Sequence, residues 1–442
     1  MSSAEPSSTL PVGRPRSRRE FVQLLAGGTA LSLTGLDRAS AAVYEGIDAL
    51  NRQVPPGTSP DGPYWEAVRR FFKMPPSYHM MNNGTVGPMP EPVFNTLVKH
   101  FRVQVTDPCR VYSFQGSKRE ELRRNLASFI GADPDEVVLT RNTTEGMNFI
   151  ASGLDMEPGD EVIISTMEHP AGRHPWYLKQ ARRGIRVVDV PIGLPPGGPG
   201  EIVAAFEEAI TPRTRIISLS HTVYISGLIA PLKELSRLAR SRDILLLADS
   251  AHGLGMLDMD MHELGIDYLT SSPYKWLGAP TGCGLLYMRK EAQAHIWPTI
   301  ASSGWDREGS ARRFETLGQR AEPLLYAFDE ALDFQNRIGR DRIERRIRTL
   351  ASRLKEGLRE IPGAHLHTSM DPYLSGGLTA FSVEGVSPST IVDYLRERYN
   401  IIIRTIGSAS AGTAGVRVST HYFVRDEAVE QVLEGVRHLV GV

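Results

Sequence analysis

Short apolar runs and helical patterns alternate along the middle of the chain. The runs are rich in Val, Ile and Leu and mostly do not alternate with polar residues, which is typical of strands buried on both faces. Helical patterns lie between them, for example over 144–154 and over 232–241. We expect strands at 136–140, 161–165, 186–190, 215–219, 244–249 and 284–288, and a loop at 195–200. Strands separated by helices predict a largely parallel α/β sheet.

The pattern changes towards the C-terminus. A long charged helical stretch is expected over 325–361, followed by strands at 378–383, 401–404 and 415–419 and helices at 389–398 and 425–439. This order predicts a smaller α+β domain. The chain then divides into a leader at 1–41, an N-terminal segment at 42–80 that packs on the small domain, a large α/β domain at 81–324 and the small domain at 325–442.

Composition and charge exclude several classes of protein. The 442 residues include 50 Lys and Arg against 51 Asp and Glu, a formal net charge of −1. Nucleic-acid binding is therefore not expected, because it usually needs a basic excess. The two cysteines, Cys109 and Cys283, could form one disulfide, but a chain of this length buries enough core to be stable without it.

The first forty residues have the pattern of a targeting segment. Arg18 and Arg19 precede Phe21, an apolar stretch covers 24–36, and the small residues Ala39-Ser40-Ala41 follow. The stretch is shorter than the roughly 20 residues that span a bilayer. The order resembles a bacterial twin-arginine (Tat) signal, although a disordered N-terminus with a chance arginine pair would also fit.

The Tat resemblance has consequences for location. It implies export of the folded enzyme by the Tat machinery and a periplasmic or extracytoplasmic location in a bacterium. The mature chain would start near Ala42. No later window is apolar enough to cross a membrane, so no membrane span is expected in the mature form.

Two residues carry the most informative chemistry. Asp249 ends an apolar run, and strand C-termini are where α/β sheets bind ligands. Lys275 lies 26 residues further on, in a loop rich in Ser, Gly and aromatic residues, and a lysine with a depressed pKa can form a Schiff base. Singly, Asp249 fits a helix cap and Lys275 a surface residue. Together they are the two groups that pyridoxal phosphate needs, one for its pyridine nitrogen and one for its aldehyde.

Six motifs, in order, resemble those of a known family. They are Asn82–Pro88, Thr140–Gly146, Met167–His169, Asp249–His252, Ser272–Trp276 and Arg417–Ser419. Each is weak alone. Together they make nearly the whole mature chain resemble the fold-type I pyridoxal-phosphate enzymes of the class V aminotransferase family, in its isopenicillin N epimerase-like and cysteine desulfurase-like branches. The resemblance implies a large, mostly parallel sheet domain, a smaller C-terminal α+β domain, and a homodimer with shared active sites.

The resemblance also assigns roles at the cofactor. It makes Lys275 the Schiff-base lysine, Asp249 the partner of the pyridine nitrogen, and His252 the neighbour of the phenolic oxygen. His169 would stack on the ring, although a lone His after a strand is otherwise more often structural. The remaining contacts are expected from Asn142, Thr143, Thr144, Ser272 and Tyr274, with Thr281 reaching the phosphate of the neighbouring subunit. Thr143 and Thr144 equally fit simple helix caps.

Substrate recognition is expected at Arg417, whose guanidinium fork fits a carboxylate with two parallel hydrogen bonds. Asn83 and Arg404 are further candidate contacts, although Arg404 equally fits an ordinary exposed arginine. Cysteine desulfurases carry a nucleophilic cysteine in the loop after the position of Arg404, where this chain has 405–410 and no cysteine. Because persulfide storage needs a thiolate, a desulfurase of that type is not expected.

Two other classes of protein compete with this interpretation. A metal hydrolase would need metal-ligand spacing, which the neighbours Glu168, His169 and His174 and the pair His365 and His367 lack, so no metal site is predicted. A non-catalytic binding protein on the same fold would be expected to have lost the lysine or the aspartate.

The reaction stays open between transamination, epimerisation and C–S or β-elimination. Epimerisation needs a second acid/base group on the far face of the cofactor, for which His169 and Tyr274 are candidates by type. Export favours an amino-acid or peptidic substrate outside central metabolism. We therefore expect aminotransferase-type tailoring of a secreted specialised metabolite, similar to Tat-exported enzymes that modify siderophore side chains.

Overall fold

A seven-stranded sheet forms the centre of the structure, a computed structural model that describes residues 18–54, 62–407 and 414–442, with only the backbone described for 18–34 and 110–115. Its strands are β2 (Val137–Thr140), β3 (Glu161–Ser165), β4 (Arg186–Val190), β5 (Thr214–Ser220), β6 (Leu245–Asp249), β7 (Tyr268–Ser271) and β8 (Gly284–Met288). They lie in the order β2-β8-β7-β6-β5-β3-β4. Only β8 runs against the others, so the sheet is mostly parallel, as the sequence predicts.

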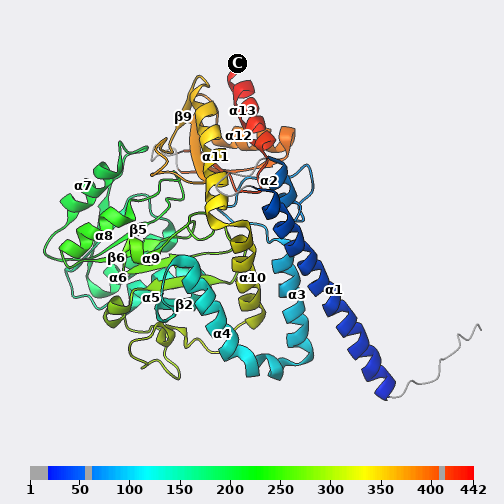
Figure 1. The fold of residues 1–442 in the computed structure, drawn as a ribbon. Coiled ribbons are helices and arrows are strands. Elements are labelled where there is room, and N and C mark those ends of the chain that lie inside the picture. The colour runs from blue at the N-terminus through cyan, green and yellow to red at the C-terminus, as the bar shows by residue number, and fades with distance from the viewer. Residues whose placement is uncertain (1–17, 55–61, 408–413) are drawn as a thin grey trace, which may run out of the picture.

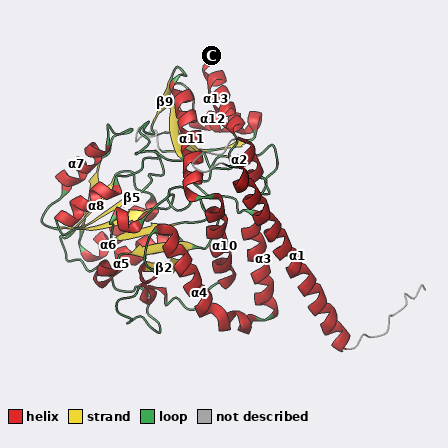
Figure 2. Cartoon of the chain, viewed as in Figure 1, coloured by secondary structure: helices red, strands yellow, loops and turns green. Residues whose placement is uncertain are grey.

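Most residues of β2, β3 and β5 to β8 are buried, whereas the edge strand β4 is partly exposed and carries Arg186 and Asp189. Ile163 and Leu246 belong to one hydrophobic core, and their neighbours Ile164 and Leu247 belong to a second core on the opposite face. Helices cover these faces (Figure 2). They are α5 (Thr143–Gly153), α6 (Pro170–Arg183), α7 (Pro199–Ala209), α8 (Leu232–Ser241) and α9 (Met261–Leu264).

A second, antiparallel sheet lies towards the C-terminal end of the molecule (Figure 1). Its strands, in spatial order, are β12 (Arg404–Ile406), β13 (Gly415–Ser419), β10 (Leu378–Val383) and β9 (Ala364–Leu366). The helices α11 (Arg340–Arg359), α12 (Pro388–Tyr399) and α13 (Asp426–Val440) pack around it. Helix α10 (Glu322–Ile338) lies beside the lobe of the large sheet and leads into α11 (Figure 1).

Four details of the expected elements are wrong. The helical stretch over 325–361 is two helices, because the chain turns at Gly339, where φ is +103°. The expected strand over 401–404 is split into β11 (Ile401–Ile402) and β12, which join different sheets. The loop over 195–200 ends at Gly198, because Pro199 begins α7. Strand β7 was not expected, since its run Tyr-Leu-Thr-Ser is half polar.

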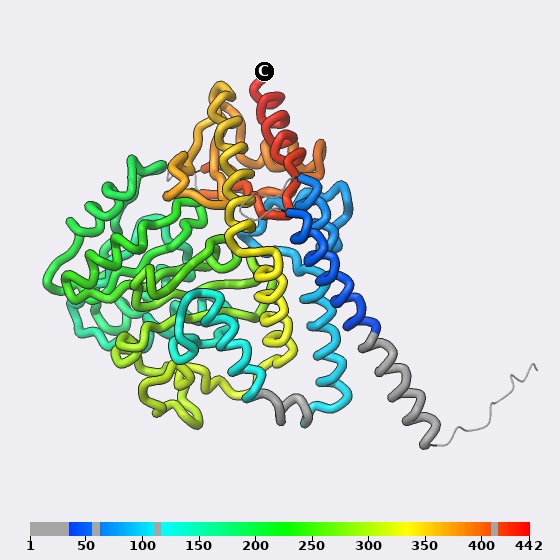
Figure 3. The backbone as a smooth tube through the Cα atoms, viewed as in Figure 1, coloured from blue at the N-terminus to red at the C-terminus, as the bar shows by residue number. Residues whose placement is uncertain are grey.

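The N-terminal part of the chain connects the two lobes. Helix α1 (Arg18–Gln53) packs on α3 (Glu91–Thr106) and α10, and α2 (Gly62–Arg69) and α4 (Pro108–Ile130) complete this side, which the tube in Figure 3 follows from residue 35 on. Strand β1 (His79–Met80) pairs in parallel with β11. Short 3-10 turns occur at Pro134–Glu136, Lys290–His295 and Ala311–Glu315.

The expected leader is only partly described. Residues 1–17 lie outside the described residues, and the expected boundary before Ala42 lies within α1. In the described part of the chain, no helix combines the length and apolar character needed to cross a membrane.

Candidate active site

A cleft opens at the carboxyl ends of β5, β6 and β7, which is where parallel sheets place their ligands. It collects residues from five separate segments of the chain because those strand ends meet at one edge of the sheet. The lining residues are Thr143, Thr144, His169, Ala171, Ser220, Thr222, Tyr224, Asp249, Ala251, His252, Ser272, Tyr274 and Lys275. Eight of the residues assigned from the sequence are therefore brought together.

Lys275 lies deep in this cleft with its amine beside an imidazole. Its Nζ is 3.5 Å from His252 Nε2. Burial lowers the pKa of Lys275 to about 8; Asp249 opposes this effect, and the charges of Arg417 and Arg404 add to it. About a tenth of the lysine is therefore a neutral amine, the nucleophilic form, at pH 7, far more than for an ordinary lysine.

Asp249 is the last residue of β6 and is buried at the floor of the cleft. One carboxylate oxygen accepts a hydrogen bond of 3.0 Å from the amide of Ala251. Burial raises the pKa of Asp249, while that amide and the charge of Lys275 lower it. A carboxylate in this position gains a strong hydrogen bond from a protonated ring nitrogen, which offsets the cost of burying its charge.

A second buried carboxylate, Glu168, lies close to Asp249; from the sequence it was considered only within a motif and as a metal ligand. The hydroxyl groups of Ser220 and Ser165 donate to it, at 2.6 and 2.5 Å. A Cβ on Gly172 would meet oxygens of both Asp249 and Glu168, at 3.4 and 3.6 Å. Burial raises the pKa of Glu168 to about 7, with Asp249 raising it further and the serine hydroxyls opposing the shift.

The polar end of the cleft is built from a helix N-terminus. Thr143 begins α5, and its amide and hydroxyl both contact Ser272 Oγ, at 3.1 and 2.8 Å. Thr144 lies beside it in the lining. Backbone amides, a helix N-terminus and hydroxyl groups are the donors that hold a phosphate. Asn142 lies just outside the lining, because its side chain caps α5 by accepting from the amide of Glu145 at 2.9 Å.

His169 and Tyr224 form one wall of the cleft. His169 caps α6 by accepting from the amide of Ala171 at Nδ1, so its ring proton lies on Nε2. Burial, then the positive charges of Lys275 and the two arginines, lowers the pKa of His169 to about 4. Tyr224 meets it edge to face with ring centroids 5.0 Å apart. Tyr224 was not identified from the sequence. Its position just after the carboxyl end of β5, where α/β sheets bind ligands, could have indicated it.

Arg417 is 1% exposed at the edge of the cleft, and its guanidinium has weak partners. Nη1 donates to the carbonyl of Tyr224 at 2.8 Å, whereas Nη2 is 3.4 Å from both Asn82 and Thr85, and Nε has no partner among the described residues. No carboxylate in the described chain pairs with it. Burial, with the charge of Arg404, lowers the pKa of Arg417 to about 9.

The loop over 82–85 is built around this arginine. A Cβ on Gly84 would lie 2.5 Å from Arg417 Nη2, so only glycine allows the loop to approach so closely. Arg404 faces Arg417 across the β12–β13 pair and is exposed, with its Nη1 3.4 Å from Thr85. Two arginines thus lie together at the mouth of the cleft.

Asn83 and Thr281 lie outside the cleft lining. Asn83 is fully buried and donates to the carbonyl of Lys275 at 3.3 Å, so it supports the lysine loop, and its Oδ1 has no partner in the described part of the molecule. Thr281 is exposed on the loop before β8. Residues 408–410, where a desulfurase cysteine would be expected, lie outside the described residues.

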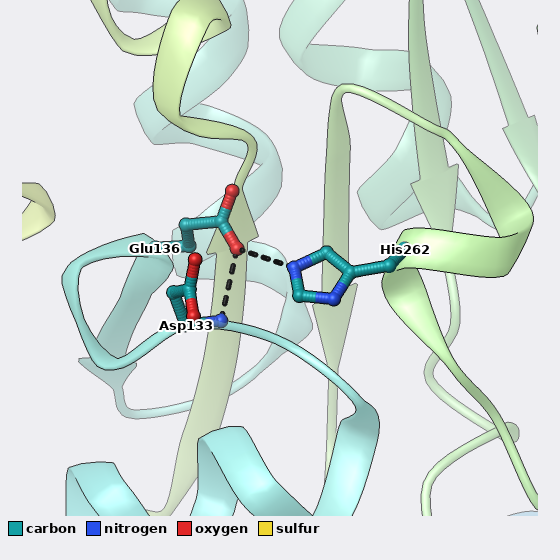
Figure 4. A group of neighbouring side chains, drawn as sticks. All are labelled: Asp133, Glu136 and His262. Atoms are coloured by element: carbon teal, nitrogen blue, oxygen red, sulfur yellow. Dashed lines mark hydrogen bonds and ion pairs between the residues drawn. The ribbon is translucent and has the colours of Figure 1, made fainter.

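The cysteines and the acidic cluster of Figure 4 are separate from this chemistry. Cys109 and Cys283 are not joined; Cys109 is exposed and Cys283 is buried, with burial raising the pKa of the Cys283 thiol to about 12. In Figure 4, Glu136 accepts from the amide of Asp133 and lies 3.5 Å from His262. Because Glu136 also accepts from the amide of Lys290, its carboxylate already satisfies backbone donors.

The cleft offers a partner for each of three groups of pyridoxal phosphate, namely its phosphate, its ring nitrogen and its aldehyde. Thr143, Thr144 and Ser272 supply donors for the phosphate, Asp249 a carboxylate for the ring nitrogen, and Lys275 an amine for the aldehyde. A half-buried lysine with a lowered pKa, together with a buried carboxylate, is the donor set that this cofactor uses. Fold and site together define a pyridoxal-phosphate-dependent enzyme of fold type I.

Comparisons with known proteins identify the family. Residues 87–432 match the family model "Aminotransferase class-V", and the chain belongs to this family. It is 31% identical over 395 residues to isopenicillin N epimerase of Streptomyces clavuligerus, covering 85% of this chain and 98% of that protein. It is 27% identical over 403 residues to a probable cysteine desulfurase of Methanothermobacter thermautotrophicus, covering 85% and 98%.

Solved structures give the same result. The structure of a C-DES mutant with glycine covalently linked to the PLP cofactor has a TM-score of 0.76 and 25% identity, covering 86% of this chain and 99% of that one. The cysteine desulfurase CsdA of Escherichia coli has a TM-score of 0.73 and 25% identity, covering 85% and 98%. The protein is therefore a class V enzyme that uses pyridoxal 5′-phosphate.

Proposed function

We propose that this enzyme removes or transfers the amino group of an amino-acid or peptidic substrate that carries a carboxylate, as an exported tailoring enzyme for a specialised metabolite. The observation that carries the proposal is Arg417, a buried guanidinium without a carboxylate partner among the described residues. A substrate carboxylate would supply the missing counter-charge through two parallel hydrogen bonds. Arg404 lies beside it for a second anionic group of the substrate.

Each residue of the site has a separate role in this reaction. Arg417 holds the substrate carboxylate, so that the amino group points at Lys275. Pyridoxal phosphate supplies an aldehyde for that amino group and a ring that accepts the electron pair released at the adjacent carbon. Lys275 would take the proton from that carbon. Asp249 would hold a proton on the ring nitrogen of the cofactor, and His169 lines the cleft as a neutral imidazole.

Epimerisation is the second candidate, because a relative is named isopenicillin N epimerase and the cleft lining contains, besides His252, the polar aromatic residues His169, Tyr224 and Tyr274. An epimerase needs a second acid/base group on the face opposite Lys275. Elimination is a third outcome of the same first steps, and a solved structure of 25% identity is a complex of the cystine C–S lyase C-DES. Sulfur transfer is not proposed, because no cysteine occurs at 404–413.

One experiment separates these reactions. The purified enzyme with pyridoxal phosphate is incubated in D2O with single-enantiomer amino acids and short peptides. A 2-oxo product formed in proportion to enzyme supports amino transfer. Deuterium at the α-carbon with inversion supports epimerisation, and release of a thiol or of pyruvate supports elimination. If no substrate gives a 2-oxo product, α-deuterium or an eliminated product, the proposed carboxylate-bearing amine substrate is contradicted.

The location and assembly form part of the proposal. The support for Tat export is the Arg18-Arg19 pair with the apolar and small residues after it. Changing both arginines to lysine should retain the protein in the cytoplasmic fraction, whereas equal export of the variant would refute a Tat signal. The support for a homodimer with shared sites is Thr281, which is exposed and outside its own cleft. Thr281→Ala should weaken cofactor retention, and a monomer by light scattering would refute sharing.

A further inference from the structure

His252 contacts two consecutive residues of one loop through its two ring nitrogens. Its Nε2 lies 3.5 Å from Lys275 Nζ, and its Nδ1 accepts a hydrogen bond of 3.2 Å from Trp276 Nε1. An indole nitrogen can only donate. Nδ1 must therefore be the unprotonated nitrogen of the imidazole, which leaves the ring proton on Nε2, the nitrogen that faces Lys275.

The imidazole is neutral in this environment. His252 is 2% exposed, and burial lowers its pKa well below the ordinary value, with the charges of Lys275 and Arg417 acting in the same direction. A neutral imidazole has two tautomers, and a neighbouring hydrogen bond selects between them. For His252, the described neighbour that makes this selection is Trp276.

The indole itself is held from several sides. Its ring stacks on His421, with centroids 5.5 Å apart and an interplanar angle of 14°. The carbonyl of Trp276 accepts from Gln335 of α10 at 2.8 Å and lies 3.0 Å from His421 Nε2. A Cβ on Gly377 would lie 2.7 Å from the indole, so the ring fills the space that this glycine leaves. Its N–H direction is thus fixed by packing from both lobes.

We propose that Trp276 is a positioning residue: its indole N–H fixes His252 in the Nε2–H tautomer and so directs a hydrogen-bond donor at the amine of Lys275. An ammonium group has no acceptor for such a donor, whereas a neutral amine does. The arrangement therefore favours the neutral form of Lys275, which is the form that attacks the cofactor's aldehyde. Trp276 acts through His252 and is not part of the cleft lining.

The tautomer can be measured directly. The full-length enzyme with pyridoxal phosphate is labelled with 15N-histidine and studied by magic-angle-spinning NMR, with His252 assigned by the signals lost in His252→Gln. We expect Nδ1 to be unprotonated and Nε2 protonated. In Trp276→Phe, which keeps an aromatic ring against His421, the ratio of the two tautomers should fall by about tenfold. Trp297→Phe is the matched control, because it removes an indole hydrogen bond to Asp155 outside the site.

Two results would overturn the proposal: a proton on Nδ1 in the unaltered enzyme, or an unchanged tautomer ratio in folded Trp276→Phe. If that variant does not fold, 15N-tryptophan labelling of the unaltered enzyme and of His252→Gln gives the answer. The indole N–H signal of Trp276 should then move when its imidazole acceptor is removed, and an unmoved signal contradicts the contact.

The rate at which cofactor-free protein takes up pyridoxal phosphate gives a second readout. Trp276→Phe should slow this rate by about tenfold in the natural background. In His252→Gln, where the amide donates without a choice of tautomer, the same change should have no further effect. Equal slowing in both backgrounds would show that Trp276 acts only through packing, and would contradict the proposal.

Discussion

Arg417→Met separates a substrate-binding role of Arg417 from a structural one, because the two roles predict opposite signs. The guanidinium is buried, and its pKa falls from 12.5 to about 9. This change corresponds to about 5 kcal/mol of unfavourable free energy for the buried charge. Methionine removes this unfavourable charge, but it also loses three hydrogen bonds, one of 2.8 Å and two of 3.4 Å, and their loss offsets part of the gain in stability. We expect the free energy of unfolding of Arg417→Met to be unchanged or higher, measured by urea denaturation.

Binding of a carboxylate should change in the opposite direction. Two charge-assisted hydrogen bonds contribute about 3 kcal/mol or more, so their loss should weaken carboxylate binding about 100- to 1,000-fold. The assay needs no knowledge of the substrate. Aminooxyacetate and O-methylhydroxylamine both react with the lysine-bound cofactor, but only the first carries a carboxylate. The second-order rate constant for aminooxyacetate should fall by about that factor in Arg417→Met, and that for O-methylhydroxylamine should not.

Arg404→Met is the control for general loss of positive charge, since Arg404 is exposed and faces Arg417 across the β12–β13 pair. It should lower the aminooxyacetate rate by less than tenfold, because an exposed charge is screened by solvent. The reasoning fails if Arg417→Met slows both reagents equally, or if it unfolds at lower urea than the unaltered enzyme. Either result would make Arg417 a structural residue.

Three further predictions concern the floor of the cleft. Lys275→Ala should abolish the visible absorption band of the lysine-bound cofactor, and a retained band would place the Schiff base elsewhere. Because the pKa of Lys275 is about 8, the uptake rate of pyridoxal phosphate by cofactor-free enzyme should rise with pH through that value and level off above it; a rate independent of pH from 6 to 9 would contradict this. The fold raises the pKa of Glu168 from 4.5 to about 7, so the folded protein favours the protonated form of this side chain. Its contribution to the free energy of unfolding is therefore complete below pH 4.5 and is lost as the pH rises through 7. Urea unfolding should therefore show Glu168→Gln gaining up to about 3 kcal/mol over the unaltered enzyme between these pH values, and parallel stability curves would refute it.

The sequence predicts the large sheet well because its strands are buried on both faces. Uninterrupted runs such as 245–249 and 284–288 have few alternatives to a buried strand, and both are strands in the structure. The structure differs from the expected elements where a single residue or a neighbouring strand outweighs the local sequence pattern. Gly339 breaks an otherwise continuous helical pattern, and β7 is a half-polar strand held by its neighbours β6 and β8. Tertiary pairing, and not local propensity, determines such a strand.

The candidate site was predictable where a residue type has few other reasons to be present. Lys275 and Asp249 belong to this group. Glu168, Tyr224 and Trp276 do not, because a glutamate beside a histidine or an aromatic residue in a loop is common in any protein. Their importance follows from three-dimensional contacts, such as the shared space beside Gly172 or the two nitrogens of one imidazole, which no spacing along the chain reveals.

The charges of the cleft are arranged so that they determine how a substrate lies within it. Arg417 and Arg404 are at the mouth, whereas Asp249 and Glu168 are at the floor, and Lys275 lies between them. A molecule with a carboxylate and an amine is therefore oriented in one way, with its carboxylate at the arginines and its amine towards Lys275, since the reverse places like charges together. Burial is the main cause that lowers the pKa of His169 to about 4 and that of Lys275 to about 8, and the charges of Arg417 and Arg404 add to it. The two arginines thus orient the substrate and also add to the effect of burial on His169 and Lys275, and Arg417→Met would weaken both contributions.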